Sequence, residues 1–97
     1  MLAFFSISPL GEGDSVSKPV AEIIAMIKAS GLEYQLTAMG TIIEGQPKAI
    51  FDLLLACHEK MRASHSRVTS KIIIDDRGDQ MGRIRSKVAA IEKHLNL

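Results

Sequence analysis

The sequence contains no tryptophan, a single cysteine and few aromatic residues, which make up 4% of its 97 residues. Cys57 cannot form a disulfide within the chain, and its place in the apolar run FDLLLACHEKM indicates a buried, reduced thiol. Because 46% of the residues are nevertheless hydrophobic, the core must be built from isoleucine, leucine, valine and alanine. A chain of this length can form one compact domain, which we expect to span residues 1–97.

The sequence also lacks a large excess of positive or negative charge. It contains 12 Lys and Arg residues and 11 Asp and Glu residues, for a net charge of +1. This balance lacks the basic surface that nucleic acids and anionic membranes require, so neither is expected as a partner. The apolar segment MLAFFSISPLG has no basic residue before it and is too short for a signal peptide or a membrane span. We therefore expect a cytoplasmic protein.

The periodicity of the apolar residues alternates between that of strands and that of helices. It predicts strands at residues 2–8, 34–38, 41–44 and 67–75. It also predicts a helix with Pro19 in its first turn that ends at Ser30, a second at about 47–63, and a last one that carries residues 81–95. Since both β-α-β units should cross over right-handed, both inner helices should cover one face of an antiparallel sheet. The order β-α-β-β-α-β plus a C-terminal helix predicts an α+β, ferredoxin-like sandwich.

Two of the predicted helices have an equally regular apolar stripe. The second helix carries Ile50, Leu53, Leu54, Cys57 and Met61 on one side, and the last helix carries Met81, Ile84, Val88, Ile91 and Leu95. Both stripes recur at helical spacing, so both are expected to be buried against another surface.

The stretch EYQLTAMGTIIEGQ predicts a hairpin with a two-residue turn at Met39-Gly40, in which Gly40 supplies a positive φ. Ala38 then faces Thr41, and Gln35 faces Glu44. One side of the hairpin is largely apolar and consists of Tyr34, Leu36, Ala38, Thr41 and Ile43. The other is mostly polar and consists of Gln35, Thr37, Ile42 and Glu44.

The first strand predicts an apolar surface on the sheet face that the two inner helices leave bare. Phe4 and Phe5 are neighbours in the chain, so they point to opposite faces, and one of the two rings lies near Ile42 on the bare side. The C-terminal helix, a second subunit, or both must cover it. We therefore expect a homo-oligomer, with a dimer of dimers as the expected form.

Three partial motifs offer little support for catalysis. His58-Glu59 begins the zinc motif H-E-x-x-H, but Arg62 stands at the second histidine position. The segment around Gly11 matches only part of a nucleotide-binding loop, and the run DDRGD that starts at Asp75 lacks the alternating ligands of a calcium loop. We therefore expect no resident cofactor or metal, and no enzymatic activity.

Four segments in order, PLGEGDSVS, SGLEYQLTAMGTIIEG, HEKM and RVTSKIIIDDR, resemble the small thiamine-binding family formerly catalogued as a domain of unknown function. The resemblance covers nearly the whole chain, and MGT-x-IEG is its most specific piece. Ala38 replaces the proline that usually precedes this methionine in the family. The resemblance implies a ferredoxin-like fold, homo-oligomers whose sheets pack together, and binding of thiamine or its pyrimidine half without established catalytic activity.

Polar residues in the matching segments suggest a binding site for such a ligand. An aminopyrimidine offers an amino donor and ring-nitrogen acceptors, and thiamine adds a positive charge. The candidate ligand-binding residues are Ser6, Thr37, Met39, Thr41 and Glu44. In this hypothesis Glu44 supplies the negative charge, Thr37 or Ser6 a hydroxyl, and Met39 an apolar wall.

Two functions from different classes remain open at this point. The first is a cytoplasmic protein that binds thiamine or hydroxymethylpyrimidine. The alternative is a non-catalytic, oligomeric regulatory or scaffold module of ferredoxin-like fold, in which Thr37 and Glu44 are ordinary solvated strand residues. Binding measurements with thiamine, thiamine phosphate and hydroxymethylpyrimidine separate the two.

Overall fold

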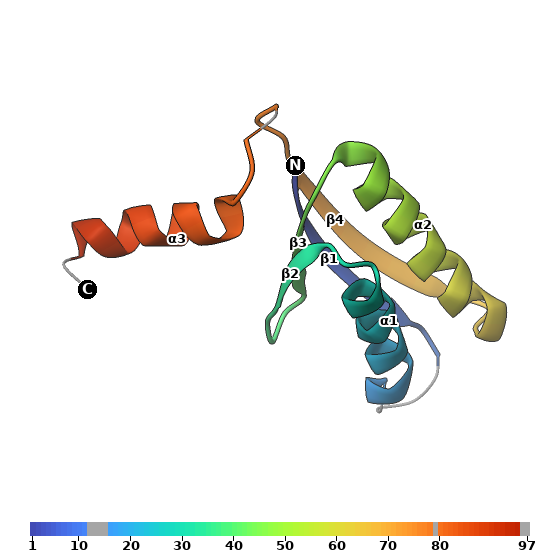
Figure 1. Ribbon diagram of the computed structural model, residues 1–97. Coiled ribbons are helices and arrows are strands. Elements are labelled where there is room, and N and C mark those ends of the chain that lie inside the picture. Colours follow the sequence, from blue (N-terminus) through green and yellow to red (C-terminus); the bar gives the residue numbers. More distant parts are fainter. Residues whose placement is uncertain (12–15, 79, 96–97) are drawn as a thin grey trace.

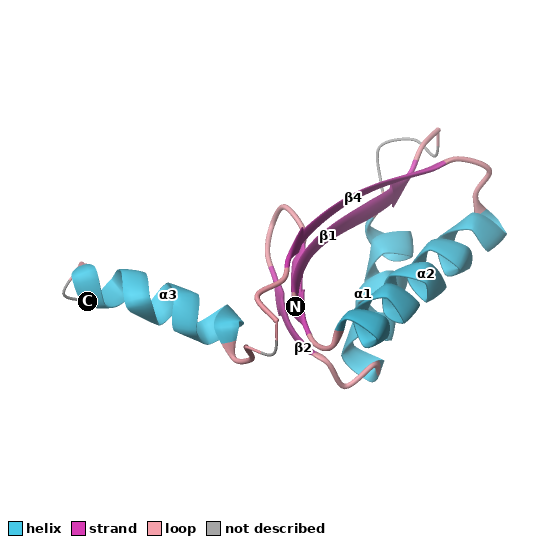
Figure 2. Cartoon of the chain, turned by 90° about the horizontal axis from the view of Figure 1, so that it is seen from above, coloured by secondary structure: helices cyan, strands magenta, loops and turns pink. Residues whose placement is uncertain are grey.

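A four-stranded antiparallel sheet carries two helices on one face, and a third helix leaves this body at one end (Figures 1 and 2). The computed structural model describes residues 1–11, 16–78 and 80–95. Its elements are β1 (Leu2–Pro9), α1 (Ser17–Ala29), β2 (Glu33–Leu36), β3 (Thr41–Glu44), α2 (Pro47–Ser64), β4 (Val68–Asp75) and α3 (Arg83–His94). The strand order is β2-β3-β1-β4, so the predicted α+β sandwich with an added C-terminal helix is confirmed.

The core lies between the sheet and the pair α1 and α2. Strand β1 alternates between the two faces, so that Phe5 is 3% exposed on the helix side while Phe4 is half-buried on the open side. The predicted stripe of α2 is buried along its whole length, from Ile50 to Met61. From α1, Ile23 and Ile27 complete this aliphatic core.

The β2–β3 hairpin corrects the predicted register. Leu36, not Ala38, lies opposite Thr41, and residues 37–40 form the connecting loop. The strand ends at Leu36 because Thr37 closes the loop: its backbone N–H and its hydroxyl both donate to the carbonyl of Gly40, at 2.8 and 2.7 Å. The shift is two residues, so each residue that stays in a strand keeps its predicted face.

Gly40 is required for a different reason from the predicted one. It is not among the glycines with positive φ, so the turn does not use its left-handed freedom. A Cβ at this position would lie 2.5 Å from Cζ of Phe4 and 2.9 Å from the carbonyl oxygen of Phe5. Glycine is therefore needed because β1 passes too close for any side chain.

The third helix begins after a turn that contains Gly78 and Gly82, both with positive φ. It projects away from the sheet in both views (Figures 1 and 2). None of the helices within residues 1–11, 16–78 and 80–95 is both long and apolar enough to cross a membrane.

Candidate functional site

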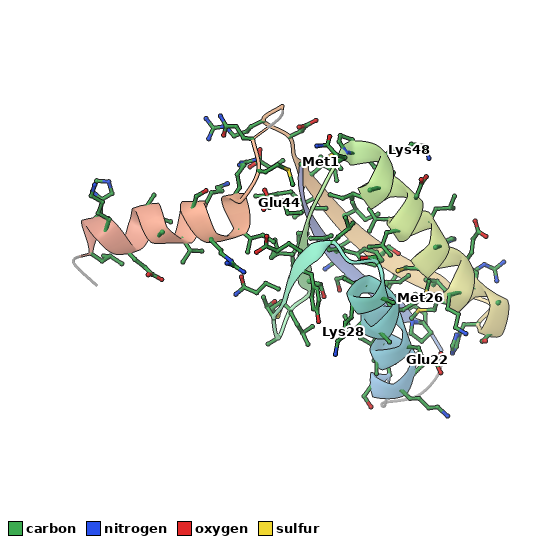
Figure 3. The ribbon with its side chains drawn as sticks, viewed as in Figure 1. Met1, Glu22, Met26, Lys28, Glu44 and Lys48 are labelled. Atoms are coloured by element: carbon green, nitrogen blue, oxygen red, sulfur yellow. The ribbon has the colours of Figure 1, made fainter. Side chains whose placement is uncertain are left out.

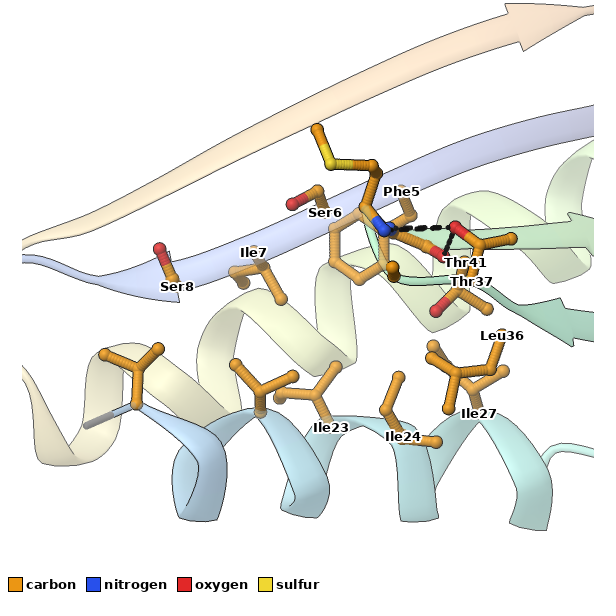
Figure 4. Close-up of a pocket in the computed structure, with 15 residues that line it drawn as sticks. Phe5, Ser6, Ile7, Ser8, Ile23, Ile24, Ile27, Leu36, Thr37 and Thr41 are labelled. Atoms are coloured by element: carbon orange, nitrogen blue, oxygen red, sulfur yellow. Dashed lines mark hydrogen bonds between the residues drawn. The ribbon is translucent and has the colours of Figure 1, made fainter. Parts of the chain in front are cut away.

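A cavity of about 240 Å³ lies between α1 and the sheet, beside the β2–β3 loop (Figure 4). The wall from α1 consists of Val16 just before the helix, and Val20, Ile23, Ile24 and Ile27 within it. The opposite wall comes from residues 5–8 of β1 and residues 36–41 of the hairpin. The cavity is thus an apolar space with a few hydroxyl groups at its edge, which is the usual composition of a small-molecule site.

Two threonines of the hairpin line this cavity in different ways. The hydroxyl of Thr37 accepts hydrogen bonds from the backbone N–H groups of Met39 and Gly40, both at 3.2 Å, besides donating to Gly40. The donor and acceptor positions of the Thr37 hydroxyl are therefore occupied by the loop backbone. Its role here is to hold the loop in shape.

Thr41, unlike Thr37, makes no hydrogen bond to the loop. It is 2% exposed and lies on the helix side of the sheet, opposite Phe5 of β1 and Leu36 of β2. The hydrogen bonds drawn among the lining residues all involve Thr37, so the Thr41 hydroxyl has no partner among them (Figure 4). A hydroxyl on the wall of a cavity is suited to donate to, or accept from, a ligand.

The other two cavity residues predicted from the sequence lie at its margin. Ser6 belongs to the lining strand, but its side chain points to the sheet face opposite Phe5 and Ile7, away from α1 (Figure 4). Met39 is 81% exposed at the tip of the loop. Ser6, Thr37, Met39 and Thr41 thus surround one cavity, with only Thr41 deep inside it.

Glu44 lies elsewhere, on the open face at the root of α3 (Figure 3). It is 2% exposed, and its carboxylate accepts backbone hydrogen bonds from Arg83 at 2.9 Å and Ile84 at 3.3 Å. These are the first N–H groups of α3, which otherwise starts at Gly82 without a side-chain cap. The sequence-based hypothesis that Glu44 and Thr37 share one ligand is therefore not matched by the geometry, because the two side chains occupy separate sites.

Arg83 extends this arrangement into a cluster that reaches from the buried Glu44 to the surface. Its side chain is 4% exposed and forms an ion pair with Asp75, whose carboxylate also binds the Lys87 ammonium at 3.1 Å. The guanidinium hydrogen bond holds the pKa of Asp75 below its ordinary value of 3.8. Sequence reasoning missed this cluster because its members are 8 to 39 positions apart in the chain.

The residues of the partial motifs do not assemble into a metal or nucleophile site. Cys57 is buried, and burial raises the pKa of its thiol to about 11. His58, next to it, is exposed on α2. Within the described residues no group of three potential ligands could hold a metal ion, and Asp79 of the DDRGD run lies outside them.

Comparisons with a family model and with known proteins agree on one family. The model of the family described as thiamine-binding protein matches residues 3–92. The chain is similar to the UPF0045 protein in the glkA 3' region of Staphylococcus xylosus, with 46% identity over 91% of this chain and 88% of the relative. It is also similar to the UPF0045 protein YqgV of Bacillus subtilis, with 38% identity over 97% of this chain and 96% of the relative.

Two solved structures have the same fold. The hypothetical protein MJ1052 of Methanocaldococcus jannaschii superposes with a TM-score of 0.86 at 37% identity, over 95% of each chain. A Thermotoga maritima protein, whose name provisionally assigns it to thiamine biosynthesis or salvage, superposes with a TM-score of 0.76 at 19% identity. That match covers 90% of this chain and 96% of the other.

Proposed function

The chain belongs to the thiamine-binding protein family, and from this premise we propose that it binds thiamine, or the hydroxymethylpyrimidine half of thiamine, in the cytoplasm. The observation that carries the proposal is the cavity beneath α1, in which the buried Thr41 hydroxyl stands among apolar side chains. The proposal is one of binding without chemical conversion of the ligand.

The shape and chemistry of the cavity suit the pyrimidine ring. A substituted pyrimidine has two apolar faces and hydrogen-bonding groups only at its edge. Ile24 and Ile27 of α1 can contact one face and Phe5 lies on the sheet side, while Thr41 reaches the edge. The hydroxyl can accept from the exocyclic amino group or donate to a ring nitrogen.

Size and charge favour the pyrimidine half as the buried part. A volume of about 240 Å³ is below the roughly 300–1,000 Å³ that is common for drug-sized ligands. Among the residues described as lining the cavity none is acidic, so the positive charge of the thiazolium ring would have no counter-ion inside. The thiazolium ring would therefore lie at the solvent-exposed mouth, near Met39.

Isothermal titration calorimetry with hydroxymethylpyrimidine, thiamine and thiamine phosphate tests the proposal. Thr41→Val keeps the shape of the side chain and should weaken binding roughly threefold to tenfold, as expected for one lost neutral hydrogen bond. Val20→Phe should fill the cavity and abolish binding while the far-UV circular dichroism spectrum stays the same. Thr69→Val, at an exposed position of β4 that does not line the cavity, is the matched control and should bind as the parent does.

Three outcomes would contradict the proposal. If the parent binds none of the three compounds, the chain does not have the proposed function and the scaffold alternative gains support. If all three bind but Val20→Phe binds equally well, the ligand occupies another site. The ligand should also be recovered unchanged after prolonged incubation, as judged by its proton NMR spectrum, and conversion would contradict the proposal of binding alone.

A further inference from the structure

The loop at the mouth of the cavity contacts a side chain on the opposite face of the sheet. Residues 37–40 join β2 to β3, and all four line the cavity. Phe4 of β1 points to the open face, because its neighbour Phe5 faces the helices. Phe4 does not itself line the cavity, but it contacts Gly40, which does.

The contact between Phe4 and Gly40 is close enough to limit where the loop can lie. A Cβ on Gly40 would lie 2.5 Å from Cζ and 2.7 Å from Cε2 of Phe4, so the far end of the ring occupies the space that a side chain would need. Atoms at van der Waals contact resist any closer approach. Gly40 therefore cannot move toward the open face while the ring stays in place.

Gly40 is also bonded to the rest of the loop through Thr37. The Gly40 carbonyl accepts hydrogen bonds from the backbone N–H of Thr37 at 2.8 Å and from its hydroxyl at 2.7 Å. The same hydroxyl accepts the N–H groups of Gly40 and Met39, both at 3.2 Å. Because these bonds converge on Thr37 and Gly40, a displacement of Gly40 would displace the whole loop.

The residue that follows Gly40 is Thr41, whose hydroxyl lies in the cavity (Figure 4). Thr41 is 2% exposed and is the first residue of β3, so its place depends on where the chain enters that strand. A hydrogen bond weakens steeply as its length and angle leave their optimum. Ligand binding through Thr41 therefore depends on the position of Gly40.

We propose that Phe4 is a positioning residue for the ligand cavity. Acting through Gly40 from the other face of the sheet, its ring holds the loop 37–40 and the Thr41 hydroxyl where a ligand can use them. The inference rests on the proposed function of the cavity and adds to it a residue that lies outside the cavity lining. Side chains that support a site in this way fix its geometry without touching the ligand.

Isothermal titration calorimetry of the full-length chain with hydroxymethylpyrimidine tests this role. Phe4→Leu removes the ring atoms that contact Gly40 and keeps an apolar side chain, and it should weaken binding about threefold to tenfold because the loop is no longer held. Ile73→Ala is the matched control, since it removes the same number of carbon atoms from the same face. Ile73 pairs with Phe4 from β4, on the side of β1 away from the hairpin, so this variant should bind as the parent does.

A double substitution separates positioning from a general structural effect. Gly40→Ala places a methyl group where the Phe4 ring lies, and it should weaken binding by at least about tenfold because the loop is displaced. In Phe4→Leu/Gly40→Ala the methyl group can enter the space that the ring has left, so the double variant should bind at least about threefold more tightly than Gly40→Ala alone. The rescue should be partial, because the Phe5 carbonyl oxygen would still lie 2.9 Å from the methyl group.

Amide hydrogen exchange in the ligand-free chain measures the loop directly. The Thr37 N–H, which donates to the Gly40 carbonyl, should exchange about threefold to tenfold faster in Phe4→Leu than in the parent. The amides of Ile23 and Ile27 in α1, on the opposite wall, should keep the rates of the parent. If the parent binds no ligand, the proposed function fails, and the exchange rate of Thr37 alone decides whether Phe4 holds the loop.

Four results would overturn the proposal. Binding by Phe4→Leu with the affinity of the parent would show that the ring does not position the cavity. An equal loss in Ile73→Ala would assign the effect to the open face as a whole and not to the contact with Gly40. A double variant that binds no better than Gly40→Ala would show that the two residues act independently. An unchanged exchange rate of the Thr37 N–H in Phe4→Leu would show that the loop is held without the ring.

Discussion

The stripes of α2 and α3 are equally regular in the sequence but lie in opposite environments. All five stripe residues of α2 are between 0% and 9% exposed, whereas Val88 and Ile91 of α3, and Met81 and Leu95 just beyond its ends, are between 49% and 63% exposed. The difference comes from topology. Helix α2 connects β3 to β4 in one sheet, and the right-handed crossover places it on the sheet, whereas no later strand returns α3 to it. Periodicity thus identifies an apolar helix face, but not the surface that covers it.

The largest expected effect is a contrast between one isoleucine from each stripe. Ile50→Ala in α2 removes a side chain with 0% exposure and should lower the free energy of unfolding by about 2–5 kcal/mol. Ile91→Ala in α3 should change it by less than about 0.5 kcal/mol when the chain is dilute enough to be monomeric. Urea denaturation measures both. Equal losses in the dilute monomer would mean that α3 packs on its own body.

The same contrast shows how far the sequence predicts this molecule. The elements, the fold and the inner stripe of α2 follow from local periodicity, and these predictions are confirmed. The hairpin register was wrong because it depends on the hydrogen bonds that Thr37 makes within the loop, which alternation does not reveal. The strand faces were still correct, since a shift by two residues leaves them unchanged.

The candidate site was predictable to a smaller extent. Ser6, Thr37, Met39 and Thr41 come from two neighbouring strands and one loop, so adjacency in the sheet brings them to one cavity. The opposite wall from α1 could not be distinguished from ordinary core by its spacing. The position of Glu44 could not be predicted either, because its partners belong to a helix that begins 39 residues later.

The second prediction, with an expected effect of intermediate size, compares Glu44 with Glu33. The two residues lie opposite each other on β3 and β2. Glu44 is 2% exposed and binds two N–H groups at the positive end of the α3 dipole, whereas Glu33 is exposed and pairs with Arg85 on the surface. Glu44→Gln should lower the free energy of unfolding by about 1.5–3 kcal/mol, as expected for lost charge-assisted hydrogen bonds. Glu33→Gln should cost about 0–1 kcal/mol.

Amide hydrogen exchange locates the effect of these two substitutions. In Glu44→Gln, protection should fall first in the opening turn of α3, while the amides of α2 keep theirs. Glu33→Gln should leave both helices protected. If Glu44→Gln is as mild as Glu33→Gln, the carboxylate does not hold the helix, and the body and α3 are joined mainly by Arg83.

The smallest expected effect is a pH dependence at the same junction. The pKa of Asp75 is lowered in the folded chain by its hydrogen bonds to Arg83 and Lys87, so the folded state favours the charged carboxylate. The stabilisation is therefore fully present above the unfolded pKa, near 3.8, and is lost as the pH falls through the lower folded value. Asp75→Asn removes this group, so its melting temperature should be below that of the parent at neutral pH. The difference should shrink once the pH is well below 3.8, where the parent's carboxyl is protonated as well. If the melting temperatures of the parent and Asp75→Asn differ equally at both pH values, the side chain acts at this junction by its shape and by neutral hydrogen bonds. Its charge would then not help to hold α3 against the body.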